Sequence, residues 1–244
     1  SPFRLTPFQV KARLVEGLGA DFLIVLHFDL DFSKSTADEF ISQILVENLR
    51  VSHMVSGFDF VFGHERQGNS AYLEARGKEL GFSTTSLTKV LDGGAEVISS
   101  TRVRALLGEG EPEQATGLLG RPYEIAGRVI TGEARGRTIG FPTANLKLDS
   151  YTKPATGVYA VQAGLAENGE LVWHDGVANL GYRPTFDGVG LLLETHLFDF
   201  KGELVSRYLR VRLISYLRDE RKFDGIDDLK AQIVKDCGDA RARL

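Results

Sequence analysis

Apolar residues near the start of the chain recur at spacings that predict a helix followed by strands. Val10, Leu14 and Leu18 stand four residues apart, which places them on one face of a helix. Residues 22–28 and 51–57 are short apolar runs of the length expected for strands. No strand-like run precedes the first helix, so the chain reads as starting inside a domain.

A second helix is predicted between those two strands. Thr36-Ala-Asp-Glu39 has the form of a capping box, and the apolar positions after it keep helical spacing: Phe40, Ile41, Ile44, Leu45 and Leu49. A third helix is predicted near residues 69–80, followed by an extended run at 82–90. Strands that alternate with helices predict an α/β layer around a mostly parallel sheet with right-handed crossovers.

The pattern changes after Leu119, where helical spacing gives way to extended stretches separated by Gly, Pro, Asn and Asp. These stretches lie at 121–132, 157–165, 171–180, 191–199 and 208–216. Strands without helices between them predict an antiparallel barrel or sandwich. Only the end is helical again, with one apolar face behind Asp224 formed by Ile226, Leu229, Ile233 and Cys237. The predicted domains are therefore 1–119 and 120–244.

Composition limits the classes of ligand and location. The 244 residues carry a net charge of −4, so no global basic field exists to hold nucleic acid or an anionic membrane. Cys237 is the single cysteine, which excludes an internal disulfide framework, and the five histidines show no metal-ligand spacing with it. The apolar run 22–26 is far shorter than the roughly 20 residues of a membrane span. Ser1-Pro-Phe3 begins no signal-peptide pattern, and we expect a protein of the reducing cytoplasm.

Two clusters have the composition of phosphate sites. Ser99, Ser100 and Thr101 open a predicted helix, where backbone N–H groups and hydroxyls suit a phosphate, and Arg104 stands one turn further along. The alternative is an N-cap with a solvated arginine. Upstream, the aromatic loop 57–63 is compatible with a planar ligand or, more commonly, with core packing.

The second cluster is the glycine- and arginine-rich stretch 127–145. Its glycines permit close backbone approach and its arginines bring positive charge, as a polyphosphate site needs: Gly127, Gly132, Gly136 and Gly140, with Arg128, Arg135 and Arg137. Thr143 and Asn145 then offer a hydroxyl and a carboxamide two residues apart, hard oxygen donors of the kind that suits Mg²⁺. An Asx turn fits the same residues equally well.

A single carboxylate is the third signal. Strand alternation in 191–200 puts Glu194 on the same face as Leu192, Phe198 and Phe200, with His196. A carboxylate facing an apolar layer is costly unless it has a partner or a task. It is either a general base in a cleft or the residue of an edge strand that reaches solvent or pairs with His196.

Taken together, these motifs resemble the bacterial bifunctional riboflavin kinase and FMN adenylyltransferase family, also called prokaryotic FAD synthetase. The resemblance covers nearly the whole chain, and several ordered motifs carry it: Gly57-Phe-Asp-Phe-Val-Phe-Gly63, Ile98-Ser-Ser-Thr-Arg-Val-Arg104, Gly120-Arg-Pro-Tyr, Gly140-Phe-Pro-Thr-Ala-Asn145, Gly176-Val-Ala-Asn-Leu-Gly-Tyr-Arg-Pro-Thr185 and Glu194-Thr-His-Leu-Phe-Asp-Phe200. It implies a nucleotidyltransferase-like, Rossmann-like α/β domain, N-terminally incomplete, in 1–119. A Greek-key antiparallel β-barrel of riboflavin kinase type with a C-terminal helix would occupy 120–244.

The resemblance also implies roles for individual residues. Thr143 and Asn145 would hold Mg²⁺ and the ATP phosphates, with Gly132 and Arg137 beside them, and Glu194 would take the proton from the 5′-hydroxyl of riboflavin. In the second reaction, ATP gives its adenylyl group to FMN. The resemblance implies that the phosphates of this second ATP are bound by Ser99, Ser100, Thr101 and Arg104. The family also opens with a His-x-Gly-His motif, which does not occur in this sequence.

We therefore expect an enzyme that makes FMN from riboflavin and ATP and, in the intact protein, FAD from FMN. In the chain as given we expect the kinase site to be kept and half of the adenylyltransferase site to be lacking. A non-catalytic flavin- or nucleotide-binding regulatory module is the alternative, and the set Thr143, Asn145 and Glu194 argues against it. A nucleic-acid-binding barrel is disfavoured by the net charge.

Overall fold

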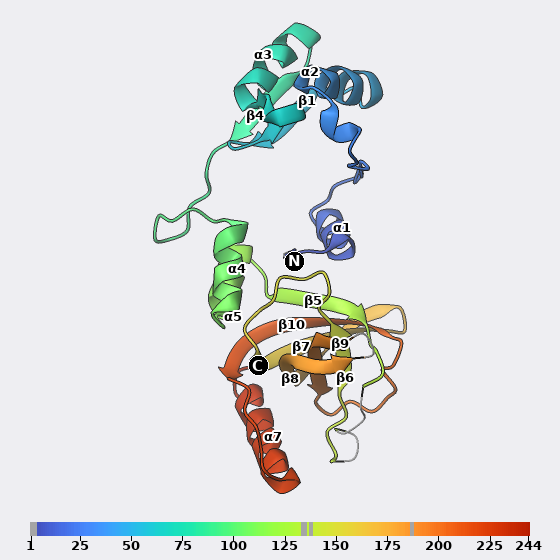
Figure 1. The fold of residues 1–244 in the computed structure, drawn as a ribbon, viewed down its shortest axis with the longest axis vertical. Helices are drawn as coiled ribbons and strands as arrows, with labels where there is room; N and C mark the ends of the chain where they lie inside the picture. The colour runs from blue at the N-terminus through green and yellow to red at the C-terminus, as the bar shows by residue number, and fades with distance from the viewer. Residues whose placement is uncertain (1–3, 133–135, 137–138, 186–187) are drawn as a thin grey trace. The chain divides into compact units, whose positions relative to one another are not determined.

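The computed structural model describes residues 4–132, 136, 139–185 and 188–244, without the side chains of 184, 185 and 188. The chain folds into two compact units, Ala20–Ile98 and a larger one formed by Ser1–Gly19 with Ser99–Leu244 (Figure 1). The predicted domain division at 119/120 stays a prediction. α1 (Phe8–Gly17), α4 (Ser100–Gly108) and α5 (Pro112–Leu119) precede that division in sequence and belong to the larger unit.

The smaller unit is built on a parallel strand pair. β1 (His53–Gly57) runs parallel to β4 (Ser83–Leu87), and α3 (Ser70–Leu80) lies between them in the chain as the crossover helix. This confirms the predicted α/β arrangement. The remaining elements of the unit are η1 (Phe32–Lys34), α2 (Ala37–Glu39), η2 (Phe40–Asn48), β2 (Val61–Phe62), η3 (His64–Arg66) and β3 (Gly68–Asn69).

Local signals in this unit act as the sequence predicts. Thr36 Oγ1 accepts a hydrogen bond from Glu39 N at 3.1 Å, and Glu39 Oε2 accepts one from Thr36 N at 2.7 Å, which is the predicted capping box. In the aromatic loop, the rings of Phe60 and Phe62 stack at 5.2 Å, and Phe62 is buried in the core of the unit. These two aromatics therefore pack in the core, while Phe58 remains half exposed.

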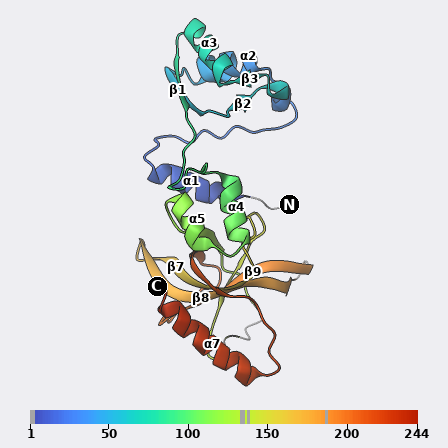
Figure 2. The same cartoon turned by 90° about the vertical axis from the view of Figure 1, so that its left-hand side faces the viewer.

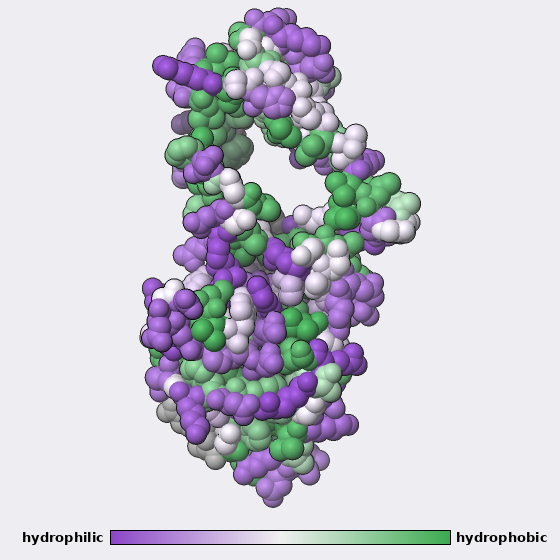
Figure 3. Space-filling view, turned by 180° about the vertical axis from the view of Figure 1, so that it is seen from behind, coloured by the Kyte–Doolittle hydropathy of each residue, from purple (hydrophilic) through white to green (hydrophobic). Residues whose placement is uncertain are grey.

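The strand predicted at 22–28 does not form. These residues have no regular secondary structure, and the apolar side chains of Phe22 and Phe28 are 86% and 74% exposed. A strand needs hydrogen-bonding neighbours, and no described segment pairs with this run. Figure 3 shows hydrophobic side chains of this kind as patches at the surface between hydrophilic ones.

The larger unit contains a six-stranded, curled antiparallel sheet in the order β5-β10-β7-β8-β9-β6. This half-barrel, with its C-terminal helix, confirms the predicted fold class of the second half. β10 comes last in the sequence but lies between the much earlier strands β5 and β7, as in a Greek-key arrangement. The strands are β5 (Tyr123–Arg128), β6 (Ala144–Lys147), β7 (Gly157–Glu167), β8 (Glu170–Thr185), β9 (Gly188–Leu197) and β10 (Tyr208–Arg218).

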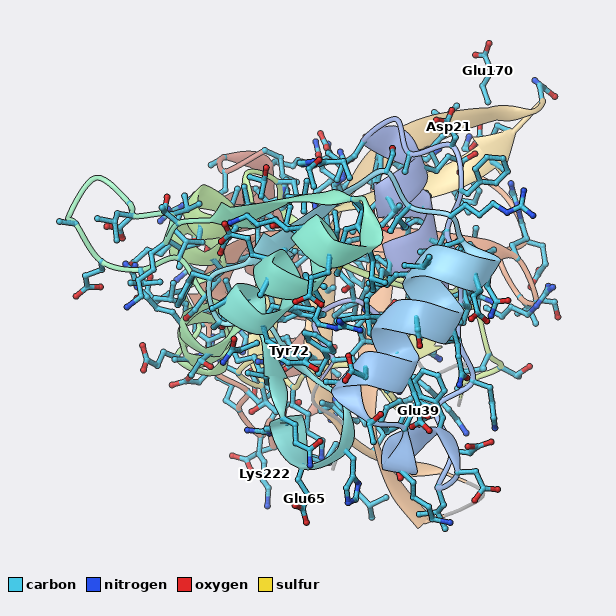
Figure 4. All side chains as sticks on the ribbon, turned by 90° about the horizontal axis from the view of Figure 1, so that it is seen from above. Asp21, Glu39, Glu65, Tyr72, Glu170 and Lys222 are labelled. Atoms are coloured by element: carbon cyan, nitrogen blue, oxygen red, sulfur yellow. The ribbon has the colours of Figure 1, made fainter. Side chains whose placement is uncertain are left out.

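Turn chemistry and alternation explain the register of this sheet. Asn168 and Gly169 both have positive φ, 50° and 89°, which is the two-residue turn that Asn-Gly favours between β7 and β8. Glu170 projects from that hairpin tip (Figure 4). Alternate residues of the central strands, such as Val161, Leu193 and Val211, are completely buried, so one face of the sheet encloses the core.

Helices cover this sheet on more than one side (Figure 2). Val10 of α1 and Val103 and Leu107 of α4 enter the core enclosed by the sheet. α1 is also tied to β5 by an ion pair from Arg13 to Glu124, whose carboxylate takes two further hydrogen bonds from Arg210, at 2.9 and 2.8 Å. Among the described residues, no helix combines the length and apolar composition needed to cross a membrane.

α7 (Ile226–Arg241) packs on the opposite face, against Val158, Ala160 and Val177, through Ala240 and, of the predicted stripe, through Cys237. Ile226 is 58% exposed, because the part of the helix nearer its C-terminus makes the contact. The helix is held by Asp236, 4% exposed, which accepts hydrogen bonds from Arg218 at 2.8 and 2.6 Å and from Gln232 at 2.7 Å. A buried carboxylate with three donors fixes the docking of α7.

We expect Asp236→Ala to destabilise the larger unit by about 3–5 kcal/mol, because it leaves the Arg218 guanidinium without its buried partner. Urea unfolding followed by the fluorescence of Trp173, the single tryptophan, measures this unit selectively. The control is Asp199→Asn, which removes the charge from an exposed ion pair to Arg241, keeps a residue type that tolerates the positive φ of 57° at this position, and should leave the urea midpoint almost unchanged. Equal midpoints for the two variants would contradict this role of Asp236.

Candidate active site

Three strands bring polar side chains into one row. Asn145 of β6 stands directly opposite Glu194 of β9, and Glu194 stands directly opposite Asn179 of β8. Directly opposed residues of antiparallel strands point to the same face of the sheet. The carboxylate of Glu194 is therefore flanked by a carboxamide on each side.

Glu194 lies on the face that alternation predicts. Leu193 and Thr195 are fully buried in the core, whereas Leu192, Glu194, His196 and Phe198 point the other way. The prediction is wrong for Phe200, which packs against the core because β9 and its alternation end at Leu197. The side chain of Glu194 is 28% exposed, at the border between apolar surface and solvent. β9 lies between β8 and β6, so the alternative of an edge strand is wrong.

The partner of Glu194 is an arginine on β8. Arg183 Nε donates to Glu194 Oε2 at 2.9 Å, and Arg183 Nη1 donates to Glu220 Oε1 at 3.1 Å. Burial opposes the charge of Arg183, but the carboxylates of Glu194 and Glu220 outweigh it, and the pKa of the guanidinium is raised. The alternative pairing of Glu194 with His196 is therefore wrong in this structure.

His196 instead fixes the loop that precedes β6. Its Nδ1 lies 2.9 Å from the carbonyl oxygen of Pro142, and its ring meets that of Phe141 edge to face at 5.5 Å. The loop is closed further by a 2.8 Å hydrogen bond from Phe141 N to the carbonyl of Gly136. These contacts hold the loop that carries Thr143, which is exposed and lies two residues before Asn145 at the end of the row.

Asn145 is the most confined polar group of the row. It is 5% exposed, and no described residue donates a hydrogen bond to its Oδ1. Its amide lies against the backbone of Gly132, where any Cβ would collide with Nδ2, and Ile130 N donates to Asn145 O at 3.0 Å. Gly132 and Asn145, predicted as parts of one site, are thus in contact, and Gly132 is required because the amide fills its side-chain position.

The remaining predicted residues are placed as follows. Arg137 lies outside the described residues, as does Arg135. Ser99 caps α4, with its Oγ accepting a 3.3 Å hydrogen bond from Arg102 N, and Ser100 and Thr101 are exposed in the first turn. Arg104 is half-buried one turn later. The helix start is as predicted, and a phosphate role for these residues remains a prediction.

Sequence reasoning missed three polar residues in or beside the row. Asn179 and Arg183 lie within a motif that carried the resemblance but received no role, although alternation along β8 places both on one face. Glu220 follows β10 and accepts hydrogen bonds from Asn179 and Arg183, each at 3.1 Å. No local pattern connects Glu220 with Glu194, because only the sheet brings them together.

Oxygen donors at one end of this row fit a hard cation. Asn145 Oδ1 is buried and accepts no hydrogen bond from any described residue, and the Thr143 hydroxyl lies two residues before it. The described residues contain no group of three or more His, Cys, Asp and Glu side chains that would form an all-protein metal cage. A Mg²⁺ ion bound here would therefore rely on few protein ligands and on substrate phosphates, which is its usual mode.

Comparison with known families agrees with this layout. A family model described as riboflavin kinase matches residues 119–244, and one described as FAD synthetase matches residues 1–102. The row of Asn145, Glu194 and Asn179 lies entirely within the riboflavin kinase match. The matches define a class of two-domain proteins with one module of each kind.

Similar proteins extend over nearly all of the chain. A bifunctional riboflavin kinase/FMN adenylyltransferase of Haemophilus influenzae is 44% identical over 243 residues, 99% of this chain and 77% of that protein. The Bacillus subtilis protein of the same name is 40% identical and covers 97% of this chain and 74% of its own length. A solved structure from Streptococcus pneumoniae described as a macrolide-efflux protein superposes with a TM-score of 0.83 at 31% identity, covering 98% of this chain and 76% of that one. The chain belongs to the bifunctional riboflavin kinase/FMN adenylyltransferase family.

The contact between Gly132 and Asn145 can be tested by adding one methyl group. Gly132→Ala should displace the Asn145 amide and weaken ATP binding at least tenfold, about 1.4 kcal/mol. Calorimetric titration with ATP measures the affinity. Gly127→Ala is the matched control, because a Cβ there meets only Leu146 Cδ2 at an ordinary 3.8 Å. Equal ATP affinities for both variants would remove Gly132 from the site.

Proposed function

We propose that this chain transfers the γ-phosphate of ATP to the 5′-hydroxyl of riboflavin, giving FMN and ADP, and that the intact protein adenylylates FMN to FAD. The observation that carries the kinase proposal is the Glu194 carboxylate held beside the buried Asn145 amide on adjacent strands. Both residues belong to the segment that matches the riboflavin kinase model. Their arrangement supplies a base and an oxygen donor within one strand spacing.

The proposed reaction assigns a separate task to each group. Glu194 accepts the proton of the 5′-hydroxyl as its oxygen attacks the γ-phosphorus, while the bond between the γ-phosphorus and the bridging oxygen breaks and ADP leaves. Thr143, Asn145 and the backbone at Gly132 hold the phosphates in line with that hydroxyl. Phosphoryl transfer depends mainly on such positioning and on neutralisation of charge.

Mg²⁺ is part of this proposal, because the donors at Thr143 and Asn145 fit it. When bound, the ion would neutralise charge on the phosphate oxygens. Thr143 Oγ1 and Asn145 Oδ1 would hold it from the protein side, and the burial of Asn145 keeps its amide in one orientation.

The adenylyltransferase reaction is proposed for the other module. Ser99, Ser100, Thr101 and Arg104 would bind the phosphates of a second ATP at the start of α4. We also predict that a polypeptide of these 244 residues lacks this activity, because its sequence has no His-x-Gly-His motif, and that the protein is cytoplasmic.

The alternative function, a non-catalytic binding module, predicts flavin binding without turnover. Incubation with riboflavin and labelled ATP distinguishes this module from a kinase.

Glu194→Gln tests the base, because it keeps the shape of the side chain and removes its basicity. Positioned proton transfer contributes about 10²- to 10⁴-fold, so kcat for FMN formation should fall by at least about 10²-fold. Riboflavin binding and the Trp173 unfolding curve should change little. The control is Glu170→Gln at the exposed hairpin tip, which should leave kcat unchanged. Near-native turnover of Glu194→Gln would exclude Glu194 as the base.

Thr143→Ala tests the phosphate side of the site. Loss of the hydroxyl should raise the KM for ATP at least tenfold, about 1.4 kcal/mol, and leave the KM for riboflavin within about threefold. Steady-state kinetics with each substrate varied in turn gives both values. Ser150→Ala, an exposed hydroxyl beyond β6, should change neither. A Thr143 variant whose main defect is in riboflavin use would contradict this assignment.

A further inference from the structure

The side chain of Arg183 on β8 reaches Glu194 only by crossing a neighbouring position of its own strand. Along this strand Asn179, Gly181 and Arg183 alternate onto the face that also carries Glu194. Asn179 is directly opposite Glu194, and Arg183 lies four residues further along, so its long side chain must reach back over Gly181 to meet the carboxylate. The route over Gly181 therefore decides whether the contact can form.

Gly181 leaves that route open. A Cβ at this position would collide with the carboxylate of Glu220 and would lie 2.8 Å from Arg183 Nη1. The chain thus has no side chain at the point where the guanidinium and the second carboxylate meet. Any larger residue would push the two groups apart.

One guanidinium is shared by two carboxylates. Arg183 Nε donates to Glu194 Oε2 at 2.9 Å, while Nη1 donates to Glu220 Oε1 at 3.1 Å and to the carbonyl of Tyr182 at 3.0 Å. Glu220 is itself held by Asn179 Nδ2 at 3.1 Å. The planar guanidinium is therefore anchored on one side and presents a single N–H to Glu194.

This contact is poorly placed to stabilise the fold. The side chains of Arg183, Glu194 and Glu220 are 34%, 28% and 33% exposed, and ion pairs with that much solvent contribute only about 0–1 kcal/mol. What the contact does supply is orientation, because it restricts the rotation of the Glu194 carboxylate. No described residue donates a hydrogen bond to Glu194 Oε1, so the second oxygen is left for another donor.

We propose that Arg183 is a positioning residue for the general base: it holds Glu194 Oε2, so that Oε1 faces the substrate hydroxyl, and Glu220 keeps the guanidinium in that place. This inference rests on the proposed function of Glu194. The clamp consists of Asn179, Arg183, Glu194 and Glu220.

The test is steady-state kinetics of FMN formation by the full chain carrying Arg183→Gln. Misplacement of a reacting group by about 1 Å costs up to 10²-fold, so kcat should fall about 10- to 100-fold with both KM values within about threefold. Arg183→Lys keeps the charge without the fork and should recover only part of the loss. Glu220→Gln should lower kcat less than Arg183→Gln. Arg241→Gln, which removes an exposed ion pair on α7, is the matched control.

The double variant Arg183→Gln/Glu194→Gln decides between positioning and a purely structural role. If Arg183 acts through Glu194, the double variant should have the same kcat as Glu194→Gln alone. Each of three results would overturn the proposal. They are a further, similar loss of kcat when Arg183→Gln is added to Glu194→Gln, an unchanged kcat for Arg183→Gln alone, and a defect confined to the KM for ATP. If Arg183→Gln does not fold, as judged by Trp173 fluorescence, the same comparison with Arg183→Lys replaces it.

Failure of this proposal and failure of the proposed function give different results. Near-native turnover of Glu194→Gln overturns the base assignment and this inference with it. A slow Glu194→Gln variant beside a fully active Arg183→Gln variant overturns only the clamp.

Discussion

The register between β6, β9 and β8 is the constraint on which the site depends. It places Asn145, Glu194 and Asn179 opposite one another, so that a carboxylate and two carboxamides share one face. A slip of one residue would turn Glu194 into the core and Leu193 out of it, at a high cost in desolvation. Burial of the leucines on the other face therefore fixes the geometry of the polar row, and core packing and site geometry have the same cause.

The polar groups of the row differ in how their hydrogen bonds are satisfied. Glu194 and Glu220 share the Arg183 guanidinium at the border with solvent, where the desolvation of each charge is incomplete. Asn145 Oδ1, in contrast, is buried without a donor from any described residue. An unsatisfied buried acceptor costs about 1–3 kcal/mol, which is the kind of local instability that binding sites retain. In the proposed function, this is the oxygen that holds Mg²⁺ together with Thr143.

The end of β10 connects this row to the terminal helix. Arg218 holds α7 through the buried carboxylate of Asp236, and Glu220, two residues later, anchors Arg183. Both contacts belong to the same compact unit. Docking of α7 and placement of the Glu194 partner therefore rely on one short segment, and disturbance of this segment would affect stability and the site together.

The sequence by itself determined what depends on neighbours along the chain: the capping box at Thr36, the Asn168-Gly169 turn and the face on which Glu194 lies. Only the tertiary structure decided what depends on distant pairing. Run 22–28 has the composition of a strand but finds no neighbour among the described residues, and β6 is too short to be recognised without its partner β9. Alternation specifies the direction of a side chain, whereas strand order specifies what it meets there. For that reason the face of Glu194 was predictable and its contact with Arg183 was not.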